Sequence, residues 1–235
     1  GLVTSNNTGV PETGQISIAN FYGASGLRTM YEQVLTGGGT FTPMYAGVPA
    51  IIQIGGGGGG GGAFVAGYDP YPANWYGRTG NPGAGDSSYV LDIDDFSGGS
   101  YFVGSGGAGG SVYSVNNDWD YGAYGTASTF SGSTYTMTAG RGGRGGAGPA
   151  PYGTLPSDPM SGNYPTDTSQ LPNEVIYNGN IIDPANFMGI GSGGAGGAGG
   201  ARTQATRPPS GGTVPAGSYG SPGGAGFLRI YYIVE

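Results

Sequence analysis

Glycine recurs with a period of three in three stretches of the sequence. These are Gly104–Ser111, Gly140–Gly148 and Ser192–Ala201, in which about two of every three residues are glycine and the others are Ala, Ser or Arg. A fourth block, Gly55–Gly62, is glycine throughout. A period of three belongs to neither the α-helix nor the β-strand; it is the period of the polyproline-II helix, which has no internal hydrogen bonds. One such helix alone would be solvated coil, whereas several side by side could bond laterally into a solid core.

The composition narrows the fold class further. The chain has 56 Gly and 17 Pro among 235 residues, which is typical of collagen or of a disordered protein. Collagen has one Gly per triplet with Pro-rich neighbours, whereas these triplets hold two Gly and little Pro. Disordered chains are usually rich in charge and poor in aromatic residues. Here charged residues make up 9% and aromatic residues 12% of the chain, so we predict an ordered protein.

The triplet register predicts how such segments would pack. Ordering glycine costs about 0.5–1 kcal/mol per residue relative to alanine, so hydrogen bonds between neighbouring backbones must offset that cost. In a Gly-Gly-X triplet two faces are bare and the third carries the side chain, which places Arg141 and Arg144 on an outer, solvated face. The block Gly55–Gly62 has three bare faces and is predicted to lie innermost, with Gly55, Gly58 and Gly61 in the scaffold core.

Extended apolar stretches lead into the glycine blocks or follow them. Thr40–Ile54 precedes the first block, Ser133–Thr138 resembles a strand entering another, and Phe227–Val234 is the strongest strand in the sequence. We predict an irregular, all-β-like fold: packed polyglycine-II helices in layers, with a few β-strands, long loops and little α-helix. Residues 1–36 are predicted to form an N-terminal attachment element, and residues 37–235 a glycine-rich sandwich with variable Tyr-rich loops.

The stretches between the glycine blocks are rich in Tyr, Trp, Asn, Ser and Gly. Such loops on a rigid scaffold are typical of a binding surface, because Tyr offers a large amphipathic contact at low entropic cost. Alternatively, the aromatic side chains cover the sides of the glycine slab, which has no apolar side chains of its own. The candidates for receptor contact are Tyr68, Tyr71, Trp75, Tyr76, Trp119, Tyr121 and Tyr124.

The sequence offers little for catalysis, cofactors or metals. It contains no Cys and no His, which removes the common catalytic triads and zinc sites, and its net charge of −7 disfavours nucleic acid as a partner. The G-x-G-x-x-G pattern within 140–145 is an automatic product of the repeat. The acidic cluster Asp92–Asp95 could bind Ca²⁺, but a solvated turn is the favoured interpretation. We predict no enzymatic activity, no cofactor and no metal site.

Three segments resemble parts of glycine-rich bacteriophage tail proteins. Gln15–Ala24 is similar to a segment of phage tail-fibre and hinge proteins, Tyr135–Gly143 to their entry into a glycine block, and Gly223–Tyr232 to their usual ending. The order of glycine blocks and variable stretches resembles the distal tail-fibre adhesins of T-even-type phages. The Pro-rich stretch 149–190 departs from that layout.

The resemblance implies a slab of polyglycine-II helices whose loops contact a host surface polysaccharide or outer-membrane protein. It also implies a virion location at a tail or tail-fibre tip, other tail or fibre proteins as partners and a possible homo-oligomer. A purely structural subunit of a tail, baseplate or filament is the alternative, and an ice-binding protein is a third. Attachment to the fibre is expected to involve residues Ile16, Ile18, Phe21 and Tyr22 of the N-terminal element.

Overall fold

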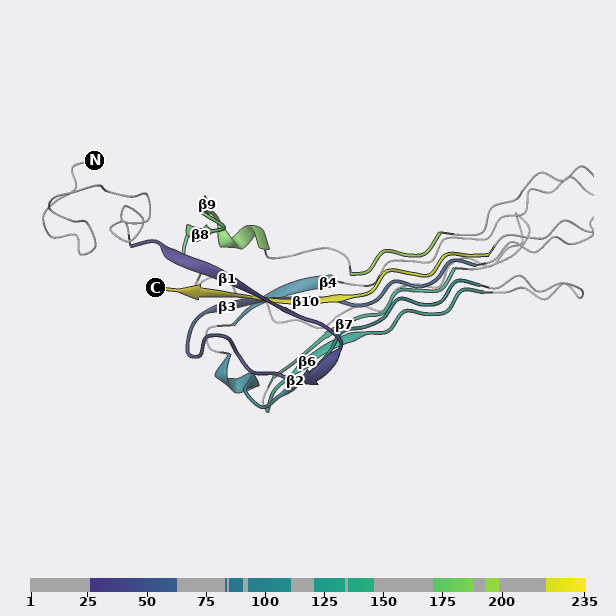
Figure 1. The fold of residues 1–235 in the computed structure, drawn as a ribbon, viewed down its shortest axis with the longest axis horizontal. Helices are drawn as coiled ribbons and strands as arrows, with labels where there is room; N and C mark the ends of the chain where they lie inside the picture. Colours follow the sequence, from purple (N-terminus) through teal and green to yellow (C-terminus); the bar gives the residue numbers. More distant parts are fainter. Residues whose placement is uncertain are drawn as a thin grey trace, which may run out of the picture.

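In the computed structural model, glycine-rich segments extend from one end of a pair of β-sheets (Figure 1). The described part contains ten β-strands and two short 3-10 helices. The predicted all-β-like fold class is therefore confirmed as far as its secondary structure is concerned. None of its helices has the length and apolar character needed to span a membrane. The structure describes residues 26–62, 83, 85–90, 93–110, 121–133, 135–145, 171–187, 193–198 and 219–235.

The larger sheet has six strands in the order β4-β3-β10-β1-β8-β9. Its neighbours are antiparallel except for β1 and β8, which are parallel. The longest pairing joins β1 to β10, from Thr29 opposite Val234 to Leu35 opposite Leu228. The strands are β1 (Arg28–Leu35), β3 (Ala50–Gly55), β4 (Gly85–Val90), β8 (Val175–Tyr177), β9 (Asn180–Ile182) and β10 (Phe227–Val234).

The smaller sheet is antiparallel throughout, in the order β2-β5-β6-β7. It consists of β2 (Gly38–Thr40), β5 (Ser100–Phe102), β6 (Ser128–Ser131) and β7 (Thr136–Ala139), while the 3-10 helices are η1 (Asp94–Phe96) and η2 (Pro184–Phe187). The strand predicted at Phe227–Val234 is confirmed as β10. The strand predicted at Ser133–Thr138 is present as β7, which begins at Thr136.

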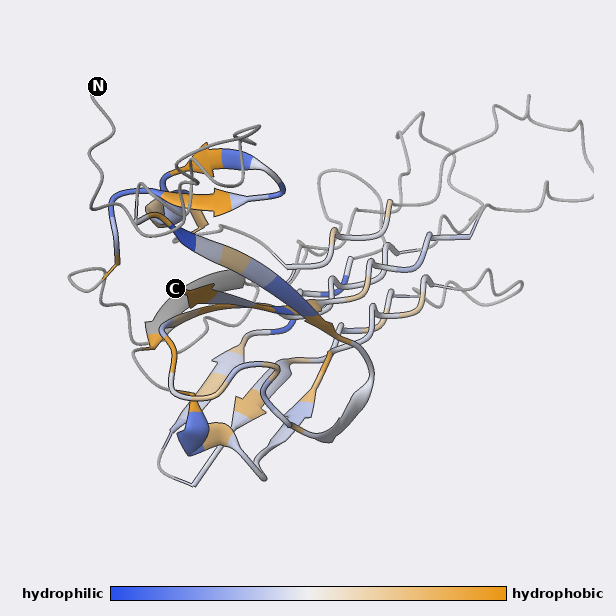
Figure 2. Ribbon diagram, turned by 60° about the vertical axis from the view of Figure 1, so that its left-hand side comes forward, coloured by the Kyte–Doolittle hydropathy of each residue, from blue (hydrophilic) through white to orange (hydrophobic). Residues whose placement is uncertain are grey.

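The main hydrophobic core lies between the two sheets. At its centre the ring of Phe130 stacks on Phe96 with centroids 4.5 Å apart and meets Phe41 edge-on at 4.8 Å. A second cluster on the other face of the larger sheet includes Ile51 and Tyr231. Because β3 and β10 are covered on both faces, their sequences are apolar at nearly every position rather than at alternate ones. Figure 2 shows apolar residues concentrated in the strands, whereas the glycine segments are nearly colourless.

Strand β1 belongs to the same sheet as the C-terminal strand. It lies between β10 and β8, and Arg28 Nη2 forms an ion pair of 2.9 Å with Glu235 Oε1. Of the predicted N-terminal element, the structure describes residues 26–36. Residues 28–35 are part of the sheet that supports the glycine segments.

Beyond the sheets, five glycine-rich segments surround a central one. The central segment, 55–62, continues β3 and is buried at every residue. The five outer segments are 104–110, which follows β5; 121–126, which precedes β6; 140–145, which follows β7; 193–198, which comes after η2; and 219–226, which precedes β10. Gly83 lies beside Gly56 and accepts a 2.6 Å hydrogen bond from Gly193 N.

In the central segment, every third glycine has its Cα hydrogen, where a side chain would stand, directed at the same neighbouring segment. A Cβ built on Gly58 would lie 2.1 Å from the carbonyl oxygen of Ala195, and one on Gly61 would lie 2.1 Å from that of Ala198. Three neighbours are contacted in this way: Gly56 and Gly59 face 140–145, Gly57 and Gly60 face 104–110, and Gly58 and Gly61 face 193–198. Backbone therefore touches backbone on all three faces, at distances that admit no side chain.

Hydrogen bonds between segments follow the same three-residue step. Gly57 N donates to Thr126 O and Gly60 N to Ala123 O, both at 2.8 Å. The carbonyl groups of the central segment accept hydrogen bonds from 104–110, 140–145 and 193–198, which run parallel to it. An example is the bond from Gly107 N to Gly58 O at 2.8 Å. The other two segments, 121–126 and 219–226, run antiparallel to the central segment. Their carbonyl groups accept hydrogen bonds from its amides. At the junction with the sheets, the buried Ser128 hydroxyl donates to Gly55 O and accepts from Gly104 N.

Candidate binding surface

All six segments reach the same level at the end of the bundle that lies away from the sheets. There Gly110 N donates to Gly61 O at 2.8 Å, and Gly220 N donates to Gly110 O at 3.0 Å. Two more bonds at this level join Gly145 N to Gly60 O and Ser221 N to Ala198 O. The stretches 111–120 and 199–218 therefore begin and end at this end of the bundle. The stretches 63–82 and 146–170 begin here and rejoin the described chain beside the sheets, at Gly83 next to Gly56 and at Leu171. Arg28 and Glu235, near the ends of the described chain, lie at the opposite end (Figure 1).

Most of the predicted contact residues belong to the stretches 63–82 and 111–120, which begin at that far end. Tyr68, Tyr71, Trp75 and Tyr76 follow the central segment in sequence, and Trp119 lies between 104–110 and 121–126. These five lie outside the described residues, as do the attachment candidates Ile16, Ile18, Phe21 and Tyr22. The structure does place Tyr121, Tyr124, Gly55, Gly58 and Gly61, the last three of which are buried in the central segment.

Tyr121 and Tyr124 stack against arginine side chains of the adjacent segment. The Cζ atom of Arg141 lies 4.3 Å from the ring centroid of Tyr124, and that of Arg144 lies 4.7 Å from Tyr121 and 5.1 Å from Tyr124. The two segments run antiparallel, joined by bonds from Gly122 N to Gly145 O and from Gly125 N to Gly142 O. We call these four side chains the Arg–Tyr strip. Both arginines are half-buried, so the predicted solvated face is partly covered by tyrosine.

The arginines of the strip differ from the other described arginines in their charge partners. Arg28 pairs with Glu235, and Arg229 Nε lies 3.7 Å from Glu32 Oε1. Within the described ranges, neither Arg141 nor Arg144 forms an ion pair with a carboxylate. The strip is thus a locally positive row on a chain whose net charge is −7.

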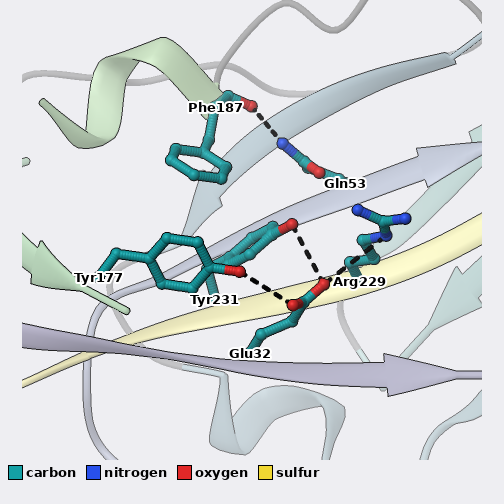
Figure 3. Close-up of polar contacts among 6 residues, drawn as sticks. All are labelled: Glu32, Gln53, Tyr177, Phe187, Arg229 and Tyr231. Atoms are coloured by element: carbon teal, nitrogen blue, oxygen red, sulfur yellow. Dashed lines mark hydrogen bonds and ion pairs between the residues drawn. The ribbon is translucent and has the colours of Figure 1, made fainter. Parts of the chain in front are cut away.

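A polar cluster that the sequence did not predict lies on the outer face of the larger sheet (Figure 3). Glu32 of β1 accepts hydrogen bonds from the hydroxyls of Tyr177 at 2.9 Å and Tyr231 at 3.3 Å, and it faces Arg229. Burial and the Glu32 carboxylate raise the pKa of Tyr177, and burial likewise raises that of Tyr231.

This Glu32 cluster, formed by Glu32, Tyr177, Tyr231 and Arg229, links neighbouring strands of the larger sheet. One carboxylate joins β1, β8 and β10, while Gln53 Nε2 donates to Phe187 O of η2 at 2.9 Å. Its members are separated by up to 199 residues, so no local motif marks them. The only sequence signal is a polar residue interrupting an apolar strand, as Gln53 does in β3.

Tyr232 of β10 is buried on the opposite face of the larger sheet, between the two sheets, and its hydroxyl also has polar partners. Its hydroxyl donates to Gln33 Oε1 and accepts from Met44 N at 3.0 Å. Burial raises the pKa of Tyr232 to about 12, although the bond from Met44 opposes part of that rise.

Tyr232 should make the protein less stable in alkali. A phenol whose folded pKa exceeds its unfolded value of about 10 stabilises the fold below that pH and loses the contribution as pH rises towards 12. We expect the free energy of unfolding, measured with urea, to fall between about pH 10 and 12, and Tyr232→Phe to flatten this fall. Tyr219→Phe, in which the lost hydroxyl comes from a side chain 69% exposed, is the control. Equal slopes for wild type and Tyr232→Phe would contradict the assignment.

Acidic side chains are scattered in the part of the chain that is described. No group of three or more acidic side chains there is placed to hold an ion. Asp94 and Asp95 of the predicted acidic cluster lie in the first turn of η1, and Asp92 lies outside the described residues.

Comparison with known proteins adds no family to this description. No protein-family model matches the sequence, and a search of curated proteins finds no similar chain.

Proposed function

We propose that the glycine segments are polyglycine-II helices packed into a sandwich. What supports this is the three-residue step shared by the sequence triplets, the facing of the central glycines and the hydrogen bonds between segments. A helix with three residues per turn and no internal hydrogen bonds must direct its amides and carbonyls to neighbours, as these segments do. The bundle would thus be a stiff rod held by backbone contacts.

We further propose that the protein sits at a phage tail or tail-fibre tip and binds a receptor on the host cell surface. The observation that carries this proposal is that the aromatic-rich stretches 63–82 and 111–120 leave the bundle at one end, opposite the sheets and Glu235. A rigid scaffold with variable loops at one end suits adhesion, and the resemblance to tail-fibre adhesins points the same way. The protein binds a host polysaccharide or outer-membrane protein and catalyses no reaction.

Cell binding tests this role directly. We expect a fluorescent fusion at Glu235 to stain some members of a panel of bacterial strains. Replacing Tyr68, Tyr71, Trp75 and Tyr76 together with Ala should reduce staining about tenfold or more, because aromatic residues carry much of the energy of binding surfaces. Tyr31→Ala is the control, since Tyr31 is 43% exposed and lies in β1 at the sheet end.

Two results would count against the adhesin. One is the absence of staining on every strain, and the other is unchanged staining by the quadruple variant. Assembly of the purified protein into filaments that bury the same aromatic residues would instead favour the structural-subunit alternative.

A further inference from the structure

The Arg–Tyr strip holds two guanidinium groups in place before any ligand arrives. A guanidinium stacked on an aromatic ring keeps its N–H donors at its edge, where they can form two parallel bonds to a carboxylate or phosphate. Arg141 stacks on Tyr124, and Arg144 lies over both Tyr121 and Tyr124. Because stacking has already restricted these long side chains, less conformational entropy remains to be lost on binding.

The positive charge of the strip is not compensated by an ion pair among the described residues. Arg28 and Arg229 are matched by Glu235 and Glu32, whereas no described carboxylate pairs with Arg141 or Arg144. At physiological salt, charges separated by more than about 8 Å are largely screened. A small anion at the strip therefore senses the two arginines more than the net charge of the whole chain.

The spacing of the two arginines suggests the form of the ligand. They are three residues apart, which in the proposed polyglycine-II geometry is one turn, or about 9 Å at about 3.1 Å per residue. Both then lie on the same side of a straight rod. A spacing of this size is close to the length of a disaccharide in an extended sugar chain.

We propose that the Arg–Tyr strip binds an acidic glycan with one carboxylate or phosphate per disaccharide. Arg141 and Arg144 each bind one acidic group, and the hydroxyls of Tyr121 and Tyr124 bond to sugar hydroxyls. This inference rests on the proposed adhesin role, because it identifies the glycan as part of the host surface. A nucleic acid fits less well, since its phosphates follow one another more closely than the two arginines do.

Titration of the full-length protein, followed by NMR, tests the site without any mutation. The probe is a hyaluronan octasaccharide, which carries one carboxylate per disaccharide, and the neutral control is the same oligosaccharide with its carboxyl groups reduced. A phosphorylated heptose oligosaccharide from a lipopolysaccharide core forms the phosphate arm. We expect shifts confined to Tyr121, Tyr124 and the amides of 141–145 with at least one acidic probe, and none with the neutral control. Which acidic probe binds distinguishes carboxylate from phosphate.

Matched variants separate a specific site from general electrostatics. Arg141→Gln with Arg144→Gln should weaken binding by about tenfold or more, because the charge-assisted bonds are lost. Arg28→Gln with Arg229→Gln removes the same charge at the sheet end and should change affinity by less than about twofold. Arg141→Lys with Arg144→Lys should bind less tightly than wild type, since an ammonium lacks the planar fork.

The proposal is overturned if neither acidic probe shifts the strip, or if the Arg141→Gln/Arg144→Gln variant binds as wild type does. Binding of a single-stranded oligonucleotide at the strip in place of the glycans would also overturn it. The staining assay keeps this failure distinct from failure of the adhesin role. Cells stained equally by wild type and by the double Gln variant would remove the strip as a receptor site and leave the adhesin standing.

Discussion

Gly58→Ala should destabilise the protein by about 3 kcal/mol, at the upper end of the cost of overpacking a core. A methyl group there would lie 2.1 Å from Ala195 O and 2.5 Å from both Ala195 C and Gly194 O. All three are backbone atoms of a segment hydrogen-bonded to the rest of the bundle, so none can move aside cheaply. Urea unfolding of wild type and variant measures the difference.

Gly39→Ala is the matched control for this substitution. The nearest atoms to a methyl group at Gly39 belong to the side chain of Tyr101, at 3.7 Å, which is ordinary van der Waals contact. Its stability should stay within about 0.5 kcal/mol of wild type. If Gly58→Ala proved as mild as Gly39→Ala, the close backbone contact of the central segment would be refuted.

Phe130→Ala should cost about 3–5 kcal/mol, the range for removing a large aromatic side chain from a core. Phe130 is fully buried between the sheets and contacts the rings of Phe96 and Phe41. Its loss would leave a cavity where β6 packs on the larger sheet. Thermal and urea unfolding are the measurements, and a loss below about 1 kcal/mol would contradict this placement of the core.

Phe102→Ala provides the comparison on the neighbouring strand. Phe102 lies in β5, opposite Thr129, and its side chain is 47% exposed. Its removal should cost less than about 1 kcal/mol. The contrast between the two phenylalanines distinguishes the core of the sheets from general sensitivity of the smaller sheet.

The glycine pattern and the apolar strands were the parts of the fold that the sequence predicted best. Both are local signals: the bounds of β10 follow from a run that is apolar except at Arg229, and the outward place of Ala195 and Ala198 follows from the triplet register. The central position occupied by Gly55–Gly62 follows from sterics alone, because a segment contacted on three faces can carry no side chain.

The remaining features depend on contacts between distant parts of the chain. The hairpin of β8 and β9 has a local signal that the sequence analysis did not use, the Asn178-Gly179 turn with both residues at positive φ. Its packing with Phe187 against the outer face of β3 and β10 depends on the tertiary fold. The Glu32 cluster requires the register of β1 against β10, which no single segment encodes. Likewise, Tyr121 and Tyr124 were predicted as contact residues from composition, but their stacking on Arg141 and Arg144 depends on which segments are neighbours in the bundle.

Site-resolved hydrogen exchange of the central glycine amides tests the account most directly. The amides of Gly57, Gly58, Gly60 and Gly61 donate to Thr126, Gly224, Ala123 and Ser221 at 2.8–2.9 Å, and all four are buried. They should therefore exchange as slowly as the amides of β10, through global unfolding. ¹⁵N-glycine labelling with exchange followed by NMR gives the rates. Exchange of these four amides at the rate of an unstructured peptide, while β10 remains protected, would contradict a backbone-bonded glycine core.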